Sequence, residues 1–262
     1  MNTTVFDIDR PRRPGALAVY LGEAAAEFLK VWRTPAFALP TLLLPAGFYL
    51  LFALVLPGEW KGFDRATYLL ATYGVFGIMG PALFGFGVGV AQERENGWLD
   101  LKRVAPMPVA AYFFGKIAMS MLFALVVVLL LSALALAGGV RIPPLQWLGL
   151  GALLVVAPLP FCALGLMIGS SVRAPAAVAI VNLVYLPLSL LSGLWMPIQV
   201  FPQWLQAFAE WLPPRPLAVM ALDVVGAGEA DWLAGTLKLV GWTALFLGVA
   251  VWLHRRGGAA QD

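Results

Sequence analysis

Six apolar stretches constrain the fold of this chain more than any other feature of its sequence. Each has about 20 residues or more, the length that a helix needs to cross a hydrocarbon core of about 30 Å. Inside a bilayer the backbone has to pair its own polar groups, and a helix does so within one segment. The stretches cover residues 36–56, 67–91, 109–138, 145–169, 174–196 and 232–253. They predict an all-α polytopic membrane protein with six transmembrane helices.

The composition excludes an ordinary soluble domain. Only 12% of the residues are charged and the mean hydropathy is +0.86, whereas soluble domains have about 25% charged residues. The 262 residues suit a single transmembrane domain, 1–262, with no second globular one. Cys162 stands alone in an apolar run and is expected to be a buried hydrophobe, not half of a disulfide. The first span starts only at residue 36, so we expect no secretory signal peptide.

The basic residues predict an orientation rather than a nucleic-acid site, because they form no single patch. If both termini are cytoplasmic, the cytoplasmic segments contain twelve Lys and Arg residues and the external segments four. Both termini are therefore expected in the cytoplasm. Lys238 lies within the sixth span, where it is either a functional charge or a snorkelling one that pairs with Asp231 or Glu229.

Residues 16–33 predict an amphipathic helix ahead of the first span. Apolar side chains recur on one stripe at helical spacing, and the charged side chains take the other side. The charged side chains are those of Glu23, Glu27, Lys30 and Arg33. A helix this short and polar lies in the membrane interface and does not span, so we expect it on the cytoplasmic surface.

The connection between the fifth and sixth spans is unusually apolar for an external loop. It is rich in Trp and Pro, and Trp204 and Trp211 fall on one helical stripe. Pro202 suits a helix start, and Pro213 and the proline after it would end the helix. The segment 197–223 predicts a re-entrant or interface-lying helical hairpin, and the alternative is an amphipathic surface loop.

Residues 92–108 concentrate charge between two apolar spans. The charged residues there are Glu93, Arg94, Glu95, Asp100, Lys102 and Arg103. Pro106 stops any helix, which leaves about two turns, and the acidic start and basic end suit the helix dipole. Composition alone leaves two interpretations open, a short cytoplasmic docking helix or a solvated loop with positive-inside charges.

The chain has no recognisable catalytic or cofactor-binding set. His254 is the one histidine, and no Cys, His or carboxylate cluster has metal-ligand spacing. The pair Gly115 and Lys116 lacks the upstream glycine and the following Ser or Thr of a Walker A loop. We therefore expect no bound metal or cofactor and no ATP hydrolysis by this chain.

The second span combines many glycines with aromatic residues. The glycines indicate close helix packing, and Pro81 indicates a kink. Phe76, Phe84 and Phe86 are candidates to face an amphiphilic substrate, if this helix lines a pathway.

The fifth span contains a mild polar stripe. Asn182 and Tyr185 lie on it, followed by Ser189 and Ser192. These side chains either belong to a substrate pathway or make hydrogen bonds between helices.

The charged segment resembles the cytoplasmic segment of type-2 ABC exporter permeases. In "ERENGWLDLKRVAPMPVAAYFFGK" an acidic–basic–acidic triplet precedes a glycine, a proline follows nine residues later, and Gly-Lys begins the next span. Two departures from the family pattern are Trp98, where Thr is usual, and Lys102, where an apolar residue is usual.

The external connection is similar to the external signature of the same family. The matching residues are Ser192, Gly193, Pro197, Pro202, Trp204, Leu205, Leu212 and Pro213. With six spans and an interfacial helix, the resemblance covers nearly the whole chain.

The resemblance implies a complex between this chain and a separate ABC ATPase. The segment 93–105 would be a coupling helix that docks on a separate ABC ATPase, through Glu93, Arg94, Glu95, Gly97, Trp98, Leu99, Asp100 and Leu101. Two ATPase copies, which bind ATP and magnesium, would act on two permease chains, most simply a homodimer. The first, second and fifth spans would lie at the dimer centre, with the hairpin as a lid. The resemblance also implies contact with membrane lipids and no binding of nucleic acid.

The substrate expected from the sequence is hydrophobic or amphipathic, a drug, an antibiotic or a lipid, because the spans contain almost no fixed charge. Export of a lipid-linked polysaccharide is the alternative. A sensor or scaffold subunit without transport also stays open. A membrane enzyme is disfavoured by the missing catalytic set, and an ATP-independent carrier by the lack of an internal repeat.

Overall fold

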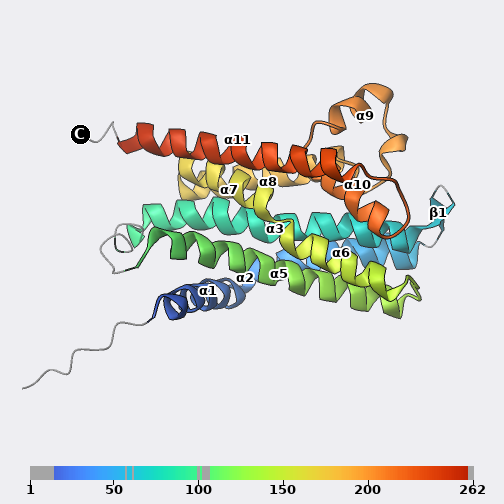
Figure 1. Ribbon diagram of the computed structural model, residues 1–262, viewed down its shortest axis with the longest axis horizontal. Coiled ribbons are helices and arrows are strands. Elements are labelled where there is room, and N and C mark those ends of the chain that lie inside the picture. The colour runs from blue at the N-terminus through green and yellow to red at the C-terminus, as the bar shows by residue number, and fades with distance from the viewer. Residues whose placement is uncertain (1–14, 57, 61, 99–100, 102–106, 259–262) are drawn as a thin grey trace, which may run out of the picture.

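The computed structural model describes residues 15–56, 58–60, 62–98, 101 and 107–258, without the side chains of Ala36 and of residues 254–258. Long helices run side by side and make a bundle (Figure 1). The elements in chain order are α1 (Ala16–Trp32), α2 (Pro35–Tyr49), η1 (Leu50–Val55), β1 (Glu59–Trp60), β2 (Phe63–Asp64), α3 (Arg65–Glu95), α5 (Val109–Ala137), α6 (Pro144–Val156), α7 (Leu159–Ser171), α8 (Ala174–Leu191), η2 (Ile198–Val200), α9 (Gln203–Ala209), α10 (Pro214–Val224) and α11 (Trp232–Gly258).

Six helical segments are long and apolar enough to cross a membrane. They are Phe37–Val55, Arg65–Glu95, Val109–Ala137, Pro144–Ser171, Ala174–Leu191 and Trp232–Leu253. The strands of the described residues amount to one two-residue antiparallel pair, β1 with β2. The prediction of an all-α polytopic membrane protein with six transmembrane helices is therefore confirmed.

The predicted fourth span consists of two helices. α6 ends at Val156 and α7 begins at Leu159, on either side of Pro158. Proline has no backbone N–H and its ring disturbs the preceding turn, so the helix is interrupted there. Together α6 and α7 still form one apolar segment of 28 residues.

α3 is the central helix of the bundle. It packs against α2, α5, α7, α8 and α10, and 89% of its most apolar window is buried inside the chain. Its glycines allow these close approaches. A Cβ placed on Gly169 of α7 would lie 2.6 Å from the carbonyl oxygen of Gly87 on α3. Small residues at such crossings let two membrane helices approach to backbone contact.

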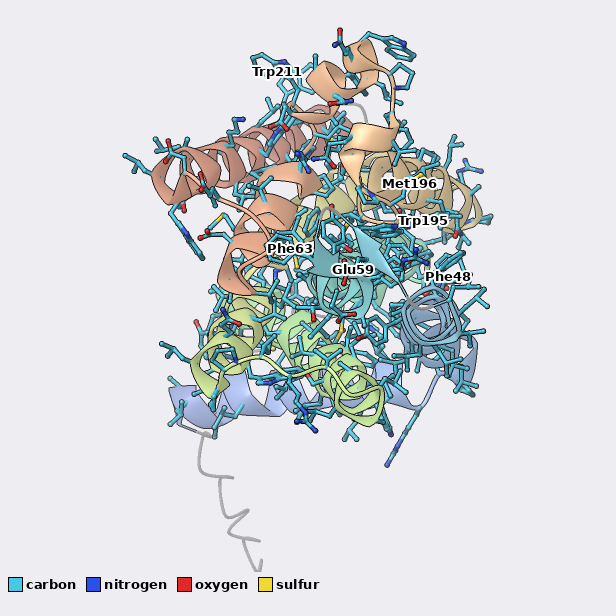
Figure 2. All side chains as sticks on the ribbon, turned by 90° about the vertical axis from the view of Figure 1, so that its right-hand side faces the viewer. Phe48, Glu59, Phe63, Trp195, Met196 and Trp211 are labelled. Carbon is cyan, nitrogen blue, oxygen red and sulfur yellow. The ribbon has the colours of Figure 1, made fainter. Side chains whose placement is uncertain are left out.

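α1 packs against α5 at one side of the bundle and crosses it at an angle (Figures 1 and 2). Its apolar residues Leu17 and Leu21 are exposed, whereas Glu27 is buried. The charged side of this helix therefore faces the rest of the chain at Glu27. The helical pattern alone did not indicate that a carboxylate would be buried here.

The two ends of the bundle differ. α3 ends, α5 begins and α11 ends at the same end, which we call the junction end (Figure 1). At the other end, α10 is buried against α3, α6 and α11. α9 stands outside it, and Trp211 lies at the outer edge of the view along the bundle (Figure 2). Phe48 and Trp195 lie nearer the centre, with ring centroids 5.2 Å apart.

Candidate functional site

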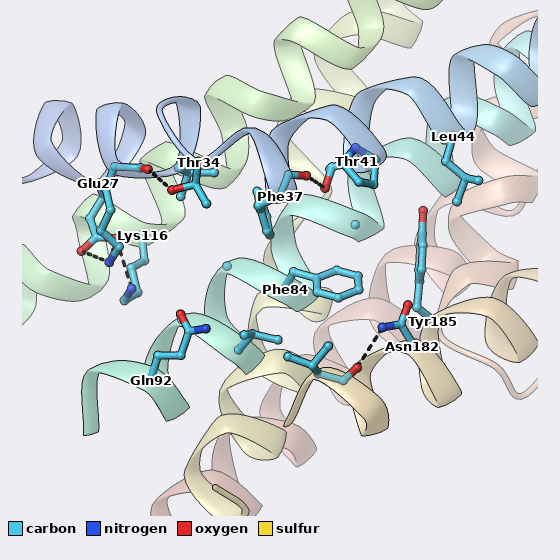
Figure 3. A pocket seen from close by; sticks show the side chains of 18 of the residues that line it. Glu27, Thr34, Phe37, Thr41, Leu44, Phe84, Gln92, Lys116, Asn182 and Tyr185 are labelled. Carbon is cyan, nitrogen blue, oxygen red and sulfur yellow. Dashed lines mark hydrogen bonds and ion pairs between the residues drawn. The ribbon is translucent and has the colours of Figure 1, made fainter. Parts of the chain in front are cut away.

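A pocket of about 440 Å³ opens between α1 and α2 on one side and α3 and α8 on the other (Figure 3). Charged and polar side chains line one end of it, and aromatic and aliphatic ones line the rest. The polar end is made by Glu27, Lys30, Gln92 and Lys116. The apolar part includes Phe37, Leu44, Phe84, Tyr185 and Leu186.

The polar end belongs to a buried network that we call the charge cluster, made of Glu27, Lys30, Glu93, Tyr112 and Lys116. The Lys116 Nζ lies 3.1 Å from a carboxylate oxygen of Glu27 and 3.1 Å from one of Glu93. The Glu93 carboxylate also accepts a 2.6 Å hydrogen bond from the Tyr112 hydroxyl and pairs with Lys30. Among the described residues, two carboxylates of the cluster meet two ammonium groups, and buried ions require such partners.

Lys30 connects the cluster to the surface. Its ammonium pairs with Glu27 at 3.2 Å as well as with Glu93, and its side chain is 39% exposed. Burial alone would lower the pKa of Lys30, but the carboxylates of Glu93 and Glu27 outweigh it and raise the pKa above its ordinary value. Lys30 is therefore a cation at neutral pH, and α1 is fixed to α3 by charge.

Side chains from α2, α3 and α8 form the apolar part of the pocket. The rings of Phe84 and Tyr185 meet edge to face, with centroids 6.2 Å apart (Figure 3). The Tyr185 hydroxyl donates a 3.1 Å hydrogen bond to the Phe76 carbonyl, so it joins α8 to α3. The Asn182 side chain donates to the Val178 carbonyl of its own helix at 2.9 Å. Because the Tyr185 hydroxyl and one Asn182 N–H are bonded to backbone carbonyls, this part of the lining offers mainly apolar contact.

The predicted pathway residues therefore separate into two groups. Phe84, Asn182 and Tyr185 line the pocket together. Phe76 lies behind it, stacked on Tyr185 at 4.9 Å. Phe86 is buried and faces α7, where its Cβ would be 3.0 Å from a Cβ placed on Gly165.

The predicted ATPase-coupling residues also separate. Glu93 is 2% exposed and belongs to the charge cluster, and Arg94 and Glu95 contact the ends of α7 and α8. Gly97 has a φ of +70°, a left-handed conformation that ends α3. Beyond it the side chains of Trp98 and Leu101 are 47% and 66% exposed. Leu99 and Asp100 lie outside the described residues.

The predicted hairpin residues lie at the far end of the molecule from this junction. Pro197 is buried directly before η2, and the Pro202 carbonyl accepts the first backbone N–H bonds of α9. Trp204 and Trp211 are more than 70% exposed. Lys238 reaches this region, where its ammonium lies 3.4 Å from the Glu210 carbonyl oxygen and not beside Asp231 or Glu229.

The charge cluster includes functional candidates that the sequence patterns did not identify. Lys116 is one of the twelve basic residues that the sequence assigns to cytoplasmic segments, yet it is 1% exposed. Its position inside the predicted span 109–138 was the available signal, because an ionisable residue within a span calls for a partner. Glu27 gave no such signal, since its helix was expected in the interface.

Two comparisons with known proteins cover most of the chain. The family described as "ABC-2 type transporter" matches residues 24–224. A relative from Bacillus subtilis (strain 168), which is named as a transport permease, YvfS, is 30% identical over 241 residues. That alignment spans 89% of this chain and 96% of the relative.

Proposed function

Since this chain belongs to the ABC-2 type transporter family and is a transport permease subunit, we propose that it exports a hydrophobic or amphipathic molecule in an ATP-driven complex. The resemblance carried by the two sequence motifs is confirmed at the level of the family. Membership implies partnership with an ABC ATPase, and the six apolar helices make this chain a multi-pass membrane protein.

The observation that supports an amphipathic substrate is the two-part lining of the pocket. Its volume of about 440 Å³ lies within the range of about 300–1,000 Å³ typical of small-molecule sites. A polar group would lie against Gln92 and Lys30, and an apolar body against Leu44 and Phe84. A drug, an antibiotic or a lipid can combine a polar group with an apolar body in this way.

We propose that two permease chains assemble, each with one ATPase. The most apolar windows of Phe37–Val55 and Ala174–Leu191 are only 28% and 22% buried inside the chain. These helices also line the pocket, so a second chain packed against them would enclose the substrate. ATP and magnesium would bind to the ATPase partner.

The proposed orientation places the junction end in the cytoplasm. The end of α3, the start of α5 and the C-terminal end of α11 lie together there (Figure 1). The Lys and Arg count favours the cytoplasm for these segments, and the exposed Trp98 and Leu101 would there be accessible to an ATPase. Both termini of a bacterial inner-membrane protein would then be cytoplasmic.

The proposal is tested by reconstituting the chain with an ABC ATPase in liposomes. A panel of amphipathic compounds is expected to stimulate ATP hydrolysis and to accumulate on the far side. Leu44→Trp fills the pocket, so the half-stimulating concentration should rise about tenfold, the equivalent of about 1.4 kcal/mol. Leu129→Trp, on an exposed part of α5 outside the pocket, is the matched control.

Two outcomes would contradict the proposal. Stimulation by a lipid-linked polysaccharide alone would replace the small amphiphile by the larger substrate. Hydrolysis without transport of any compound would indicate a sensor or scaffold.

A further inference from the structure

Glu93, Arg94 and Glu95 point in three different directions from the last turn of α3. Successive residues of an α-helix are about 100° apart around its axis, so three neighbours reach three sides. We call these residues the triplet. Each of them contacts a different part of the bundle.

Glu93 joins α3 to α1 and α5. Its carboxylate binds Lys116 and Tyr112 of α5 and Lys30 of α1. Because Lys30 and Lys116 also line the pocket, this contact connects the end of α3 to one wall of the pocket.

Arg94 holds the C-terminal end of α7. Its two terminal guanidinium nitrogens donate to the carbonyl oxygens of Ser170, at 2.5 Å, and of Val172, at 2.6 Å. The last carbonyls of a helix have no partner inside the helix, and a cation near them is favourable for the helix dipole.

Glu95 holds the N-terminal end of α8. Its carboxylate accepts a 3.1 Å hydrogen bond from the backbone N–H of Ala174, the first residue of α8. The first N–H groups of a helix lack partners, and an anion is favourable there. Only Val172 and Arg173 separate α7 from α8, so Arg94 and Glu95 hold the two sides of one tight turn.

Glu93 is buried, and Arg94 and Glu95 are exposed but have their polar groups bonded to the ends of α7 and α8. We infer that the triplet connects helices of this chain and positions them around the pocket, and that it is not the surface that contacts the ATPase. A displacement of the segment after Gly97 would reach α1, α5, α7 and α8 through these three side chains. Three of those helices, α1, α5 and α8, line the pocket. Trp98 and Leu101 are exposed and follow the left-handed turn at Gly97. The contact with the ATPase is therefore assigned to these two residues. The inference rests on the proposed function, in which the ATPase drives the permease.

A distance measurement tests the connection without any transport assay. Spin labels are attached to Asn96→Cys and Ser171→Cys, two exposed positions at the ends of α3 and α7. Cys162 is buried and is replaced by Ala to keep the labelling specific. In the otherwise unchanged chain, the distribution of label distances should be narrow. Arg94→Met should broaden it, and Arg94→Lys should give an intermediate width.

Assembly and coupling are then measured separately in the complex with the ATPase. Arg94→Met and Glu95→Gln are expected to bind the ATPase within about twofold of the unchanged chain, but to lose about tenfold in substrate stimulation of hydrolysis. Trp98→Ala should weaken ATPase binding instead. Thermal unfolding and gel filtration in detergent identify variants that fail to fold. If Arg94→Met fails to fold, the conservative Arg94→Lys variant is compared with the unchanged chain instead.

Two results would overturn the inference. One is a label distance distribution that stays narrow in Arg94→Met. The other is a loss of ATPase binding in Arg94→Met and Glu95→Gln as large as in Trp98→Ala. If the unchanged chain transports nothing, the proposed function fails, while the distance measurement still decides whether the triplet connects these helices.

Discussion

The Lys116 ammonium lies 3.1 Å from a Glu27 carboxylate oxygen, although 89 residues of sequence separate the two. The contact fixes α1, the helix expected in the membrane interface, to α5, the third span. Lys116 meets Glu93 at the same distance, so a single ammonium joins three helices. The arrangement makes α1 part of the bundle and not a helix held by lipid alone.

Replacing Lys116 by Met is expected to destabilise the protein by about 3 kcal/mol, because two buried carboxylates lose a shared cation. Chemical unfolding in detergent micelles measures the change. Lys30→Met is the comparison and should cost less than Lys116→Met, because the side chain of Lys30 is 39% exposed and water can replace it beside the carboxylates. The double variant Glu93→Gln and Lys116→Met should cost less than the sum of the two single changes. Equal costs for Lys116→Met and Lys30→Met would contradict the buried network.

Gly169→Ala should disturb the contact between α3 and α7. The added Cβ would lie 2.6 Å from the Gly87 carbonyl oxygen, a backbone atom that cannot turn away. Overpacking of this kind costs about 1–3 kcal/mol. Gly241→Ala in α11 is the control, because a Cβ there meets no atom within 4 Å. Unfolding midpoints that fall equally in both variants would argue against the close approach.

Gly97→Ala should cost about 1–2 kcal/mol, because its φ of +70° is unfavourable for a residue with a Cβ. Gly97→Asn should cost less, since Asn adopts this conformation more readily than Ala. The strain would be relieved by turning the exposed Trp98 and Leu101, so ATPase binding should weaken in the same order, Ala more than Asn. Thermal unfolding and co-purification with the ATPase measure the two effects. A larger loss in the Asn variant would refute the role of the turn.

Trp204 and Trp211 are expected to lie in the membrane interface, where tryptophan is enriched. Both are more than 70% exposed, within α9 and just after it, at the end of the bundle where α11 begins (Figure 1). Lipids brominated near the headgroup should therefore quench the fluorescence of the chain, and replacing both residues by Phe should remove a measurable share of the quenching. Trp195→Phe, nearer the bundle centre, should remove less. The opposite order would place α9 in water.

The spans could be predicted because apolar length is a local property that any window of the sequence reveals. The break at Pro158 was also visible as a residue, but an apolar run on both sides concealed the separation into α6 and α7. Length and hydropathy decide whether a segment enters the bilayer, and they do not describe how its backbone continues there.

The partners of charged residues could not be predicted to the same degree. Arg94 and Glu95 bind backbone groups of Ser170, Val172 and Ala174, which leave no mark in the sequence. Glu27 and Lys116 meet through the crossing of two helices, which no local periodicity encodes. For Lys238, nearby carboxylates suggested a partner, whereas the helix places its ammonium beside the Glu210 carbonyl.

The burial of α3 has a consequence for biosynthesis. α3 is the second span to be made, while α5, α7 and α8, which cover it, follow later along the chain. Until they arrive, its glycine-rich surface faces lipid, and lipid gives two apolar helices little reason to associate. The nascent chain must therefore keep an uncovered central helix in the membrane until α8 ends at Leu191, 96 residues after the end of α3.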